Sequence, residues 1–369
     1  MTHSPSTDGD LPVDPFVERE KLTSSPTAAG QPVLSVRDLS VHFPTDDGVV
    51  KAVDGVSFDV FENEVLGIVG ESGSGKSVTS MAILGLLPKR ARIEGEVLYR
   101  GTSLLDATEH DLRELRGSRL AMVFQDALAA LNPVYRVGSQ IGEAIKVHNR
   151  GLSRDEIRKR ALQLLELVGI PNPQQRVDDY PHEYSGGMRQ RAMIAMSIAN
   201  DPDVLIADEP TTALDVTIQA QVLEVLERVQ ARTNSAIILI THDLGVVAGV
   251  ADRVLVMYAG RAVEVGSVDQ VFYKSQHPYT LGLLASLPRL DQDTKDVRLH
   301  RIEGQPPSLI NVPQGCPFHP RCLFARTPDP CASDRPELRP LDEADHVAAC
   351  HFSEEVLTAR PDELRTRVR

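Results

Sequence analysis

Hydrophobic and polar positions alternate at two places in the first 70 residues, after a polar N-terminal stretch. Residues 33–43 and 56–70 show the period of two that is typical of β-strands, and a Glu-Asn turn divides the second stretch into two strands. Residues 93–101 and 119–125 are further strand candidates. The pattern over residues 76–88 predicts a helix that ends at its last residue, a proline.

The pattern becomes helical between about residues 128 and 200. The clearest helix spans residues 153–170 and opens with a capping box, in which Ser153 and Glu156 would each bond the backbone of the other. Its apolar residues keep to one helical face: Ile157, Ala161, Leu164, Leu165 and Val168. This part of the chain is therefore predicted to be a helical insertion.

Two short, continuously apolar stretches follow the helical region, at residues 204–209 and 235–243. Runs of this kind are typical of strands that are buried on both faces of a parallel sheet. Residues 216–230 between them predict a helix, whose apolar side holds Ile218, Val222, Val225, Leu226 and Val229. A strand, a helix and a second strand in this order predict a parallel α/β fold.

Composition and charge exclude several classes of protein. The chain has 369 residues, of which 41% are hydrophobic and 25% charged, as in ordinary globular proteins. No apolar run approaches the roughly 18 residues that span a bilayer, and the polar residues 1–30 predict a disordered tail rather than a signal peptide. We therefore expect a cytoplasmic protein. Its net charge of −13 opposes nonspecific binding to nucleic acid.

A glycine-rich stretch from Gly70 to Ser77, GESGSGKS, links a predicted strand to a predicted helix. In a P-loop of this kind the glycines let successive N–H groups point at phosphate oxygens, and the helix N-terminus adds partial positive charge. Lys76 would reach the β- and γ-phosphates, and Ser77 would bind Mg²⁺. The alternative is a Gly-Ser turn that matches the pattern by chance, which the strand–helix context disfavours.

Polar residues follow the predicted strands at what should be one edge of the sheet. Asp208, at the end of an apolar run, would help to hold Mg²⁺, and the next residue, Glu209, would polarise the attacking water. His242 follows the next apolar run and could contact the γ-phosphate, and Gln125 ends another strand. Taken singly, these residues fit solvated strand ends or surface positions. The P-loop upstream favours a functional site.

The stretch from Tyr184 to Met188, YSGGM, resembles the signature sequence of ABC ATPases, with Tyr and Met in place of the usual Leu and Gln. Its phosphate-contacting part is intact in Ser185, Gly186 and Gly187. The other motifs of this family occur in order: Phe43 as the aromatic that stacks on adenine, the P-loop, Gln125 of the Q-loop, Asp208 and Glu209 of Walker B, Ala213 to Asp215 of the D-loop, and the switch His242. The resemblance covers residues 33 to about 285.

Two further segments are similar to bacterial oligopeptide and dipeptide permease ATPases, at residues 276–288 and 315–322. The resemblance implies an α/β fold with a RecA-like parallel sheet core, an antiparallel β subdomain, a helical signature subdomain and a small cysteine-containing C-terminal extension. It divides the chain into a tail (1–30), a nucleotide-binding domain (31–285, with the helical subdomain at about 128–200) and the extension (286–369).

The resemblance also implies ATP and Mg²⁺ as ligands. Catalysis would fall to Glu209, His242 and Gln125, and Mg²⁺ would be bound by Ser77, Gln125 and Asp208. The implied nucleotide contacts are Phe43, Gly70, Ser72, Gly73, Ser74, Gly75, Lys76, Ser77, Val78, Gln125, Asp208, Ser185, Gly186, Gly187 and Asp215.

As a member of this family, the chain would be the ATP-hydrolysing subunit of a di-/oligopeptide importer at the cytoplasmic face of the cell membrane. Its partners would be a second ABC ATPase, for which the family favours a paralogue packed head to tail, two transmembrane permeases and, through them, an extracytoplasmic peptide-binding protein. Relatives import nickel, glutathione or sugars, so the cargo stays open. A soluble ABC ATPase acting on nucleic acid or ribosomes is the alternative from another class. The single cassette, the acidic charge and the lack of heptads disfavour it.

All four cysteines, Cys316, Cys322, Cys331 and Cys350, lie within 35 residues, separated by 5, 8 and 18 residues. Buried or free thiols are one interpretation, but clustering in a polar, proline-rich segment favours a metal site, and both zinc and iron–sulfur clusters accept four thiolates. His319 and His351 could substitute in a zinc site but fit better as neighbours.

Relatives with this cysteine pattern carry a 4Fe–4S cluster, so the resemblance implies iron, with Zn²⁺ as the alternative. Because the cysteines lie far in the sequence from the P-loop, we expect Cys316→Ser to lose the metal and to leave ATP binding at Lys76 largely intact.

Overall fold

The computed structural model describes residues 30–126, 130–212, 214–287, 301–340 and 345–359. The predicted N-terminal tail therefore lies outside the described residues, apart from Gly30, and so does Ala213 of the predicted D-loop. The domain boundaries proposed from the sequence stay a prediction.

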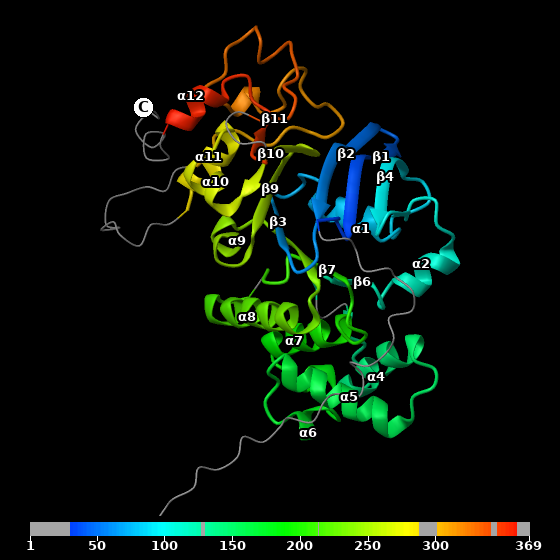
Figure 1. Cartoon of the computed structure of the whole chain (residues 1–369). Coiled ribbons are helices and arrows are strands. Elements are labelled where there is room, and N and C mark those ends of the chain that lie inside the picture. Colours follow the sequence, from blue (N-terminus) through cyan, green and yellow to red (C-terminus); the bar gives the residue numbers. More distant parts are fainter. Residues whose placement is uncertain (1–29, 127–129, 213, 288–300, 341–344, 360–369) are drawn as a thin grey trace, which may run out of the picture. The chain divides into compact units, whose positions relative to one another are not determined.

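Two sheets form the β-structure of the described residues (Figure 1). The smaller is antiparallel, in the order β2 (Gly48–Val60), β1 (Leu34–Thr45), β4 (Arg92–Tyr99) and β5 (Thr102–Ser103). The larger has the order β11 (Arg339–Pro340), β12 (Val347–Ala348), β10 (Arg261–Ser267), β9 (Arg253–Tyr258), β3 (Val65–Val69), β8 (Ala236–Thr241), β7 (Val204–Asp208) and β6 (Leu120–Val123). Strands β9, β3, β8, β7 and β6 run parallel to one another, which confirms the predicted parallel core beside an antiparallel sheet.

The parallel strands are buried on both faces, as their continuous apolar runs predict. Val204 and Ile206 of β7 belong to a core shared with the antiparallel sheet and α1 (Lys76–Ile83). Leu205 and Ala207 point the other way, into a core shared with the helical region and α8 (Val216–Thr233). The period of two in a strand therefore distributes alternate residues between two hydrophobic cores.

The helical region contains α4 (Val137–His148), α5 (Arg154–Leu167), α6 (Pro173–Arg176), a 3₁₀ turn (Pro181–Glu183) and α7 (Gly186–Ser197). The predicted capping box is present: Ser153 Oγ accepts from Glu156 N–H, and the Glu156 carboxylate accepts from Ser153 N–H. Four of the five predicted apolar residues of α5 are buried, and Ile157 is partly buried against the same core. The helical insertion is thus confirmed.

Two predicted boundaries were wrong. The helix predicted to run to Pro88 ends at Ile83, because Gly85 adopts a φ of +61° and closes a Schellman turn, in which Leu86 N–H bonds Met81 O and Gly85 N–H bonds Ala82 O. Strand β2 begins at Gly48, eight residues before the predicted start, because the antiparallel ladder with β1 continues to the turn. Helix α2 (Glu109–Leu115), which Thr108 caps, was not predicted.

The remaining helices are α9 (Leu244–Val250), α10 (Val268–Tyr273), α11 (Pro278–Ala285) and α12 (Ser353–Thr358). Strands β11 and β12 attach the cysteine-containing segment to the edge of the large sheet. The fully buried Glu264 of β10 reinforces this attachment, because it lies 2.9 Å from His346 Nε2. The same carboxylate accepts from the N–H groups of Gln276 and His277, just before α11. The C-terminal segment therefore packs directly on the edge of the large sheet.

Candidate nucleotide site

The P-loop lies between the central strand β3 and helix α1, as predicted. Gly75, directly before the helix, has a φ of +104°, and a Cβ atom there would stand 2.3 Å from Ala52 O. Only glycine fits this position without displacing the backbone of β2. The buried Ser74 Oγ has no hydrogen-bond partner among the described residues, so it is free to meet a ligand oxygen.

Lys76 is 4% exposed, and its ammonium reaches back over the loop to donate to Gly70 O at 2.7 Å and Glu71 O at 3.0 Å. Burial lowers the pKa of Lys76, while nearby carboxylates, Glu209 first among them, act in the opposite direction. The ammonium is thus held inside the loop by two carbonyl oxygens, which phosphate oxygens could replace.

Ser77 and Asp208 meet at the carboxyl edge of the parallel strands. Ser77 Oγ donates to Asp208 Oδ1 over 3.0 Å. Burial raises the pKa of Asp208, and the hydrogen bond from Ser77 opposes that rise. A hydroxyl and a carboxylate at this distance are oxygen donors of the kind that Mg²⁺ prefers beside a phosphate.

Glu209 lies where the ends of β6, β7 and β8 come together. Its Oε2 accepts from Gln125 Nε2, beyond β6, at 3.0 Å, and lies 3.6 Å from His242 Nδ1, beyond β8. Thr212 Oγ1 donates to the same oxygen at 2.8 Å, a contact that the sequence analysis missed. Glu209 has a φ of +47°, which is rare for a residue with a side chain and is typical of backbone held at a functional position.

The signature residues stand apart from this group, at the N-terminus of α7. Ser185 caps the helix by accepting from Met188 N–H, and both Ser185 and Gly186 are exposed. Gly187 is buried because Ile218 of α8 packs where its side chain would be. An exposed N-terminus of a 12-residue helix presents N–H groups and partial positive charge to an anion. Among the described residues, no hydrogen bond joins the signature to the P-loop of the same chain.

Comparison with known proteins identifies the family of the chain. Residues 53–212 match the ABC transporter family, and residues 263–331 match the C-terminal region of oligopeptide/dipeptide transporters. The chain is 52% identical over 298 residues to the dipeptide transport ATP-binding protein DppD of Lactococcus lactis, covering 80% of this chain and 85% of that protein. The chain belongs to the ABC transporter family.

Two further relatives support the assignment to this ABC transporter family. The oligopeptide transport ATP-binding protein OppD of Bacillus subtilis is 52% identical over 295 residues, which cover 79% of this chain and 82% of that protein. Among solved structures, a dimeric ATP-binding cassette in a post-hydrolysis state with ADP and Pi superposes with a TM-score of 0.58 at 26% identity, over 64% of this chain and 98% of that one. The chain is accordingly an ABC-type ATPase, for which ATP and Mg²⁺ are the expected ligands.

The other motif residues of this ABC ATPase lie on separate elements. Phe43 is half-buried on β1, opposite Val50 of β2. Val78 of α1 packs partly buried against the first core. Asp215 caps α8 by accepting from Ile218 N–H at 3.0 Å. Within the described part of the chain, the side chains that contact Glu209 are those of Gln125, Thr212 and His242, and none of the three motif residues above is among them.

The four cysteines of this ABC ATPase are free thiols that line one small cavity, together with the aromatic rings of Phe318, Phe324 and Phe352. Backbone N–H groups approach three of the sulfur atoms: Phe324 N–H to Cys322, Arg326 N–H to Cys331 and Phe352 N–H to Cys350, at 3.3–3.4 Å. Burial raises the pKa of Cys316, and it raises the pKa of Cys322 and of Cys350 to about 12. Within the described ranges, no three His, Cys, Asp or Glu side chains form a group arranged to hold a metal ion.

Proposed function

We propose that this chain is the ATP-hydrolysing subunit of an ABC importer for di- or oligopeptides. The observation that carries the proposal is the convergence of Gln125 and His242 on Glu209, next to the Ser77–Asp208 pair. Five residues from three strand ends and the P-loop helix thereby supply the charges and hydrogen bonds that ATP hydrolysis needs.

Each residue has a distinct role in the proposed reaction. Lys76 would contact the β- and γ-phosphates, and Phe43 would stack on adenine. The other residues that would cradle the phosphates are Gly70, Ser72, Gly73, Ser74, Gly75, Ser77 and Val78. Ser77, Gln125 and Asp208 would hold Mg²⁺, which would neutralise charge on the phosphate oxygens.

Glu209 polarises a water molecule, whose oxygen attacks the γ-phosphorus as the bond to the ADP oxygen breaks, and His242 orients that water. Gln125 couples the presence of the γ-phosphate to the helical region.

A second cassette completes the site. Ser185, Gly186, Gly187 and Asp215 would contact the nucleotide held by the P-loop of a partner in a head-to-tail dimer, because in this chain they lie on elements separate from its own P-loop. A paralogue is the proposed partner. The solved cassette with a TM-score of 0.58 is described as dimeric, which supports this arrangement.

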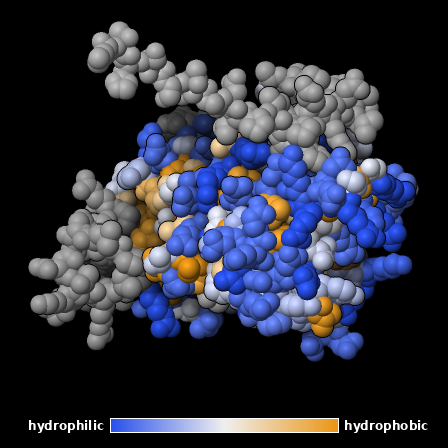
Figure 2. Space-filling view, turned by 90° about the horizontal axis from the view of Figure 1, so that it is seen from below, coloured by the Kyte–Doolittle hydropathy of each residue, from blue (hydrophilic) through white to orange (hydrophobic). Residues whose placement is uncertain are grey.

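The importer needs permeases as further partners. In the described residues no helix is long and apolar enough to cross a membrane. Phe124, Val134 and Tyr135 are large hydrophobic residues that are 44%, 70% and 59% exposed near Gln125 and the start of α4. Figure 2 shows hydrophobic residues in patches on a mostly hydrophilic face of the molecule. We propose that these three residues contact a permease at the cytoplasmic face of the membrane, and that a peptide-binding protein acts from the other side.

The test is reconstitution of the chain in vesicles with two permeases, a second cassette and a peptide-binding protein from the same organism. Peptide with its binding protein should stimulate ATP hydrolysis, whereas the isolated chain should hydrolyse ATP weakly. Parallel arms offer nickel, glutathione or a sugar, and stimulation by one of these would replace peptide as the cargo. Stimulation of the isolated chain by nucleic acid or ribosomes, with none by the permeases, would contradict the transport function.

The cysteine cavity is proposed as a second ligand site, for a 4Fe–4S cluster held by Cys316, Cys322, Cys331 and Cys350. Four thiols at one cavity, with N–H groups directed at three sulfur atoms, are donors of the type that such a cluster or Zn²⁺ accepts, although no three of the described side chains are arranged to hold a metal ion. Binding would require the thiols to lose their protons, because burial raises their pKa values. When bound, the cluster would clamp the C-terminal segment, and no step of ATP hydrolysis passes through it.

A further inference from the structure

The cysteine-containing segment reaches into the P-loop through one side chain, Arg321. Its guanidinium forms a bidentate pair with Glu71, the second residue of the P-loop: Nη1 lies 2.7 Å from Oε2, and Nη2 lies 2.9 Å from Oε1. The two residues are 250 positions apart in the sequence. A planar bidentate pair of this kind fixes the relative orientation of both partners.

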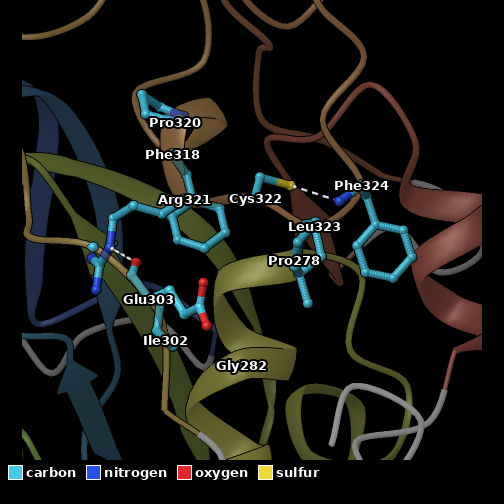
Figure 3. A pocket seen from close by; sticks show the side chains of 11 residues that line it. Pro278, Gly282, Ile302, Glu303, Phe318, Pro320, Arg321, Cys322, Leu323 and Phe324 are labelled. Carbon is cyan, nitrogen blue, oxygen red and sulfur yellow. Dashed lines mark hydrogen bonds between the residues drawn. The ribbon is translucent and has the colours of Figure 1, made fainter. Parts of the chain in front are cut away.

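Arg321 is held from several sides. Its side chain is 5% exposed, its Nε donates to Glu303 O at 3.0 Å, and its Nη1 also lies 3.3 Å from the Tyr258 hydroxyl. Figure 3 shows the side chain extending from the segment beside Phe318 toward Glu303. A bonded and nearly buried guanidinium in a single orientation gives Glu71 little freedom to move.

Glu71 is held in turn at its backbone, because its N–H donates to the Tyr279 hydroxyl at 2.9 Å. Tyr279, Tyr258 and Phe318 form a buried aromatic cluster with ring centroids 4.7–5.4 Å apart. Phe318 belongs to the cysteine segment, so the same segment supports the P-loop both by packing and by charge.

The charge of Glu71 matters because the P-loop binds an anion. A carboxylate in this loop opposes the approach of phosphate, and Glu71 lies close enough to Lys76 for its charge to favour the ammonium. Arg321 compensates that negative charge. Removing one partner of a largely buried ion pair leaves the charge of the other uncompensated. This destabilises the protein more than removing both charges does.

Arg321 lies in a short turn between two of the cysteines. Cys316 O accepts from His319 N–H, and Phe318 O accepts from Arg321 N–H, so that a tight 3₁₀ turn joins Cys316 to Cys322. Both cysteines line the same cavity. Any change that loosens this turn would therefore move the guanidinium bound to the P-loop.

We propose that Arg321 is a positioning residue for the P-loop, which neutralises and orients Glu71 and so makes ATP affinity depend on the fold of the cysteine segment. The inference rests on the ATPase function proposed above. It replaces the expectation that the cysteine segment leaves ATP binding intact, since that expectation assumed that sequence distance meant spatial distance.

The test compares Mg·ATP binding by the full-length chain and its variants, measured by calorimetry. Arg321→Gln should weaken ATP binding about fivefold or more, a coupling typical of linked sites. Glu71→Gln alone should bind ATP at least as tightly as the wild type. The double variant Arg321→Gln/Glu71→Gln should regain most of the lost affinity, because no uncompensated carboxylate remains.

Arg335→Gln is the matched control. Arg335 also belongs to the C-terminal segment and pairs with an acid of the core, Asp54 at 3.2 Å, but Asp54 lies on β2 and keeps Arg261 as a partner. ATP affinity should not change in this variant.

Several outcomes overturn the inference. If Arg321→Gln binds ATP as the wild type does, or if the double variant stays as weak as the single one, Arg321 does not act through the charge of Glu71. If Arg321→Gln does not fold, the Glu71→Gln variant provides the test. A lower ATP affinity of Glu71→Gln would contradict the proposal that Arg321 neutralises an unfavourable charge on Glu71. A wild-type chain that binds no ATP, or a Lys76→Ala variant with unchanged affinity, would instead contradict the ATPase function itself.

Discussion

Ser77 Oγ donates a hydrogen bond to Asp208 Oδ1 over 3.0 Å, although 131 positions separate the two residues. Helix α1 and strand β7 bring them together, because β8 alone stands between β3, which leads into the P-loop, and β7. Parallel strands end at one edge of the sheet, so the residues that follow them share a site.

Glu209→Gln should lower the rate of ATP hydrolysis in the assembled transporter by about 10²- to 10⁴-fold, the usual contribution of a general base. The amide keeps the shape and the partners of the carboxylate but cannot accept the proton of water. ATP binding should be retained and the closed dimer should live longer. Phosphate release is the measurement, with Glu224→Gln on the exposed side of α8 as control. Near wild-type turnover by Glu209→Gln would show that another group is the base.

Lys76→Ala should weaken ATP binding itself, by about tenfold or more, because hydrogen bonds to a charged group contribute roughly 1.5–3 kcal/mol. The ammonium now held by Gly70 O and Glu71 O would no longer be available to phosphate oxygens. Equilibrium binding of Mg·ATP to the full chain measures the effect. The assignment of Lys76 fails if affinity is unchanged while the variant unfolds at the wild-type temperature.

Asp208→Asn should stabilise the Mg-free chain at neutral pH. Burial raises the pKa of Asp208, so the folded chain holds this proton more tightly than the unfolded chain does. The contribution of this group to the free energy of unfolding is therefore lost as the pH rises from about 4, in the ordinary carboxyl range, through the folded-state pKa. Asparagine removes this loss, so the unfolding midpoint should rise at neutral pH.

Thermal unfolding with and without Mg·ATP checks this expectation. The wild type should gain more from Mg·ATP than Asp208→Asn, which lacks the carboxylate ligand. Asp269→Asn, at an exposed position of α10, should match the wild type in both conditions. A midpoint for Asp208→Asn below that of the wild type without Mg²⁺ would refute the effect of burial.

Anaerobically purified chain should contain about four irons with matching sulfide and absorb broadly near roughly 400 nm. Cys316→Ser should lose the metal and, through Arg321, bind ATP more weakly. Metal analysis, visible absorption and calorimetry measure the three effects. One zinc and no colour would identify the alternative metal, whereas a chain without metal would show that the cavity holds free thiols.

Much of the site could be predicted from the sequence because its determinants are local. The P-loop needs only a strand, a glycine-rich turn and a helix in succession, and the capping box of Ser153 and Glu156 spans a single helical turn. Continuous apolar runs predicted β7 and β8, since a strand with two covered faces has no polar side. These features depend on backbone chemistry and on periods of two and 3.6 residues, which neighbouring residues alone establish.

The tertiary structure decided what depends on residues far apart. Helix α1 ends at Ile83 because of the left-handed turn at Gly85, and not at the proline that the sequence pattern indicated. The contact of Thr212 with Glu209 needs a loop conformation that no periodicity encodes. The pair of Arg321 and Glu71 is the clearest case, because Arg321 sits in a proline-rich, polar segment that reads as a loop. Charges 250 residues apart can pair only when strand order and packing have placed them side by side. The candidate phosphate site could therefore be predicted from the sequence by itself, whereas the contact of Arg321 that orients Glu71 could be found only in the folded chain.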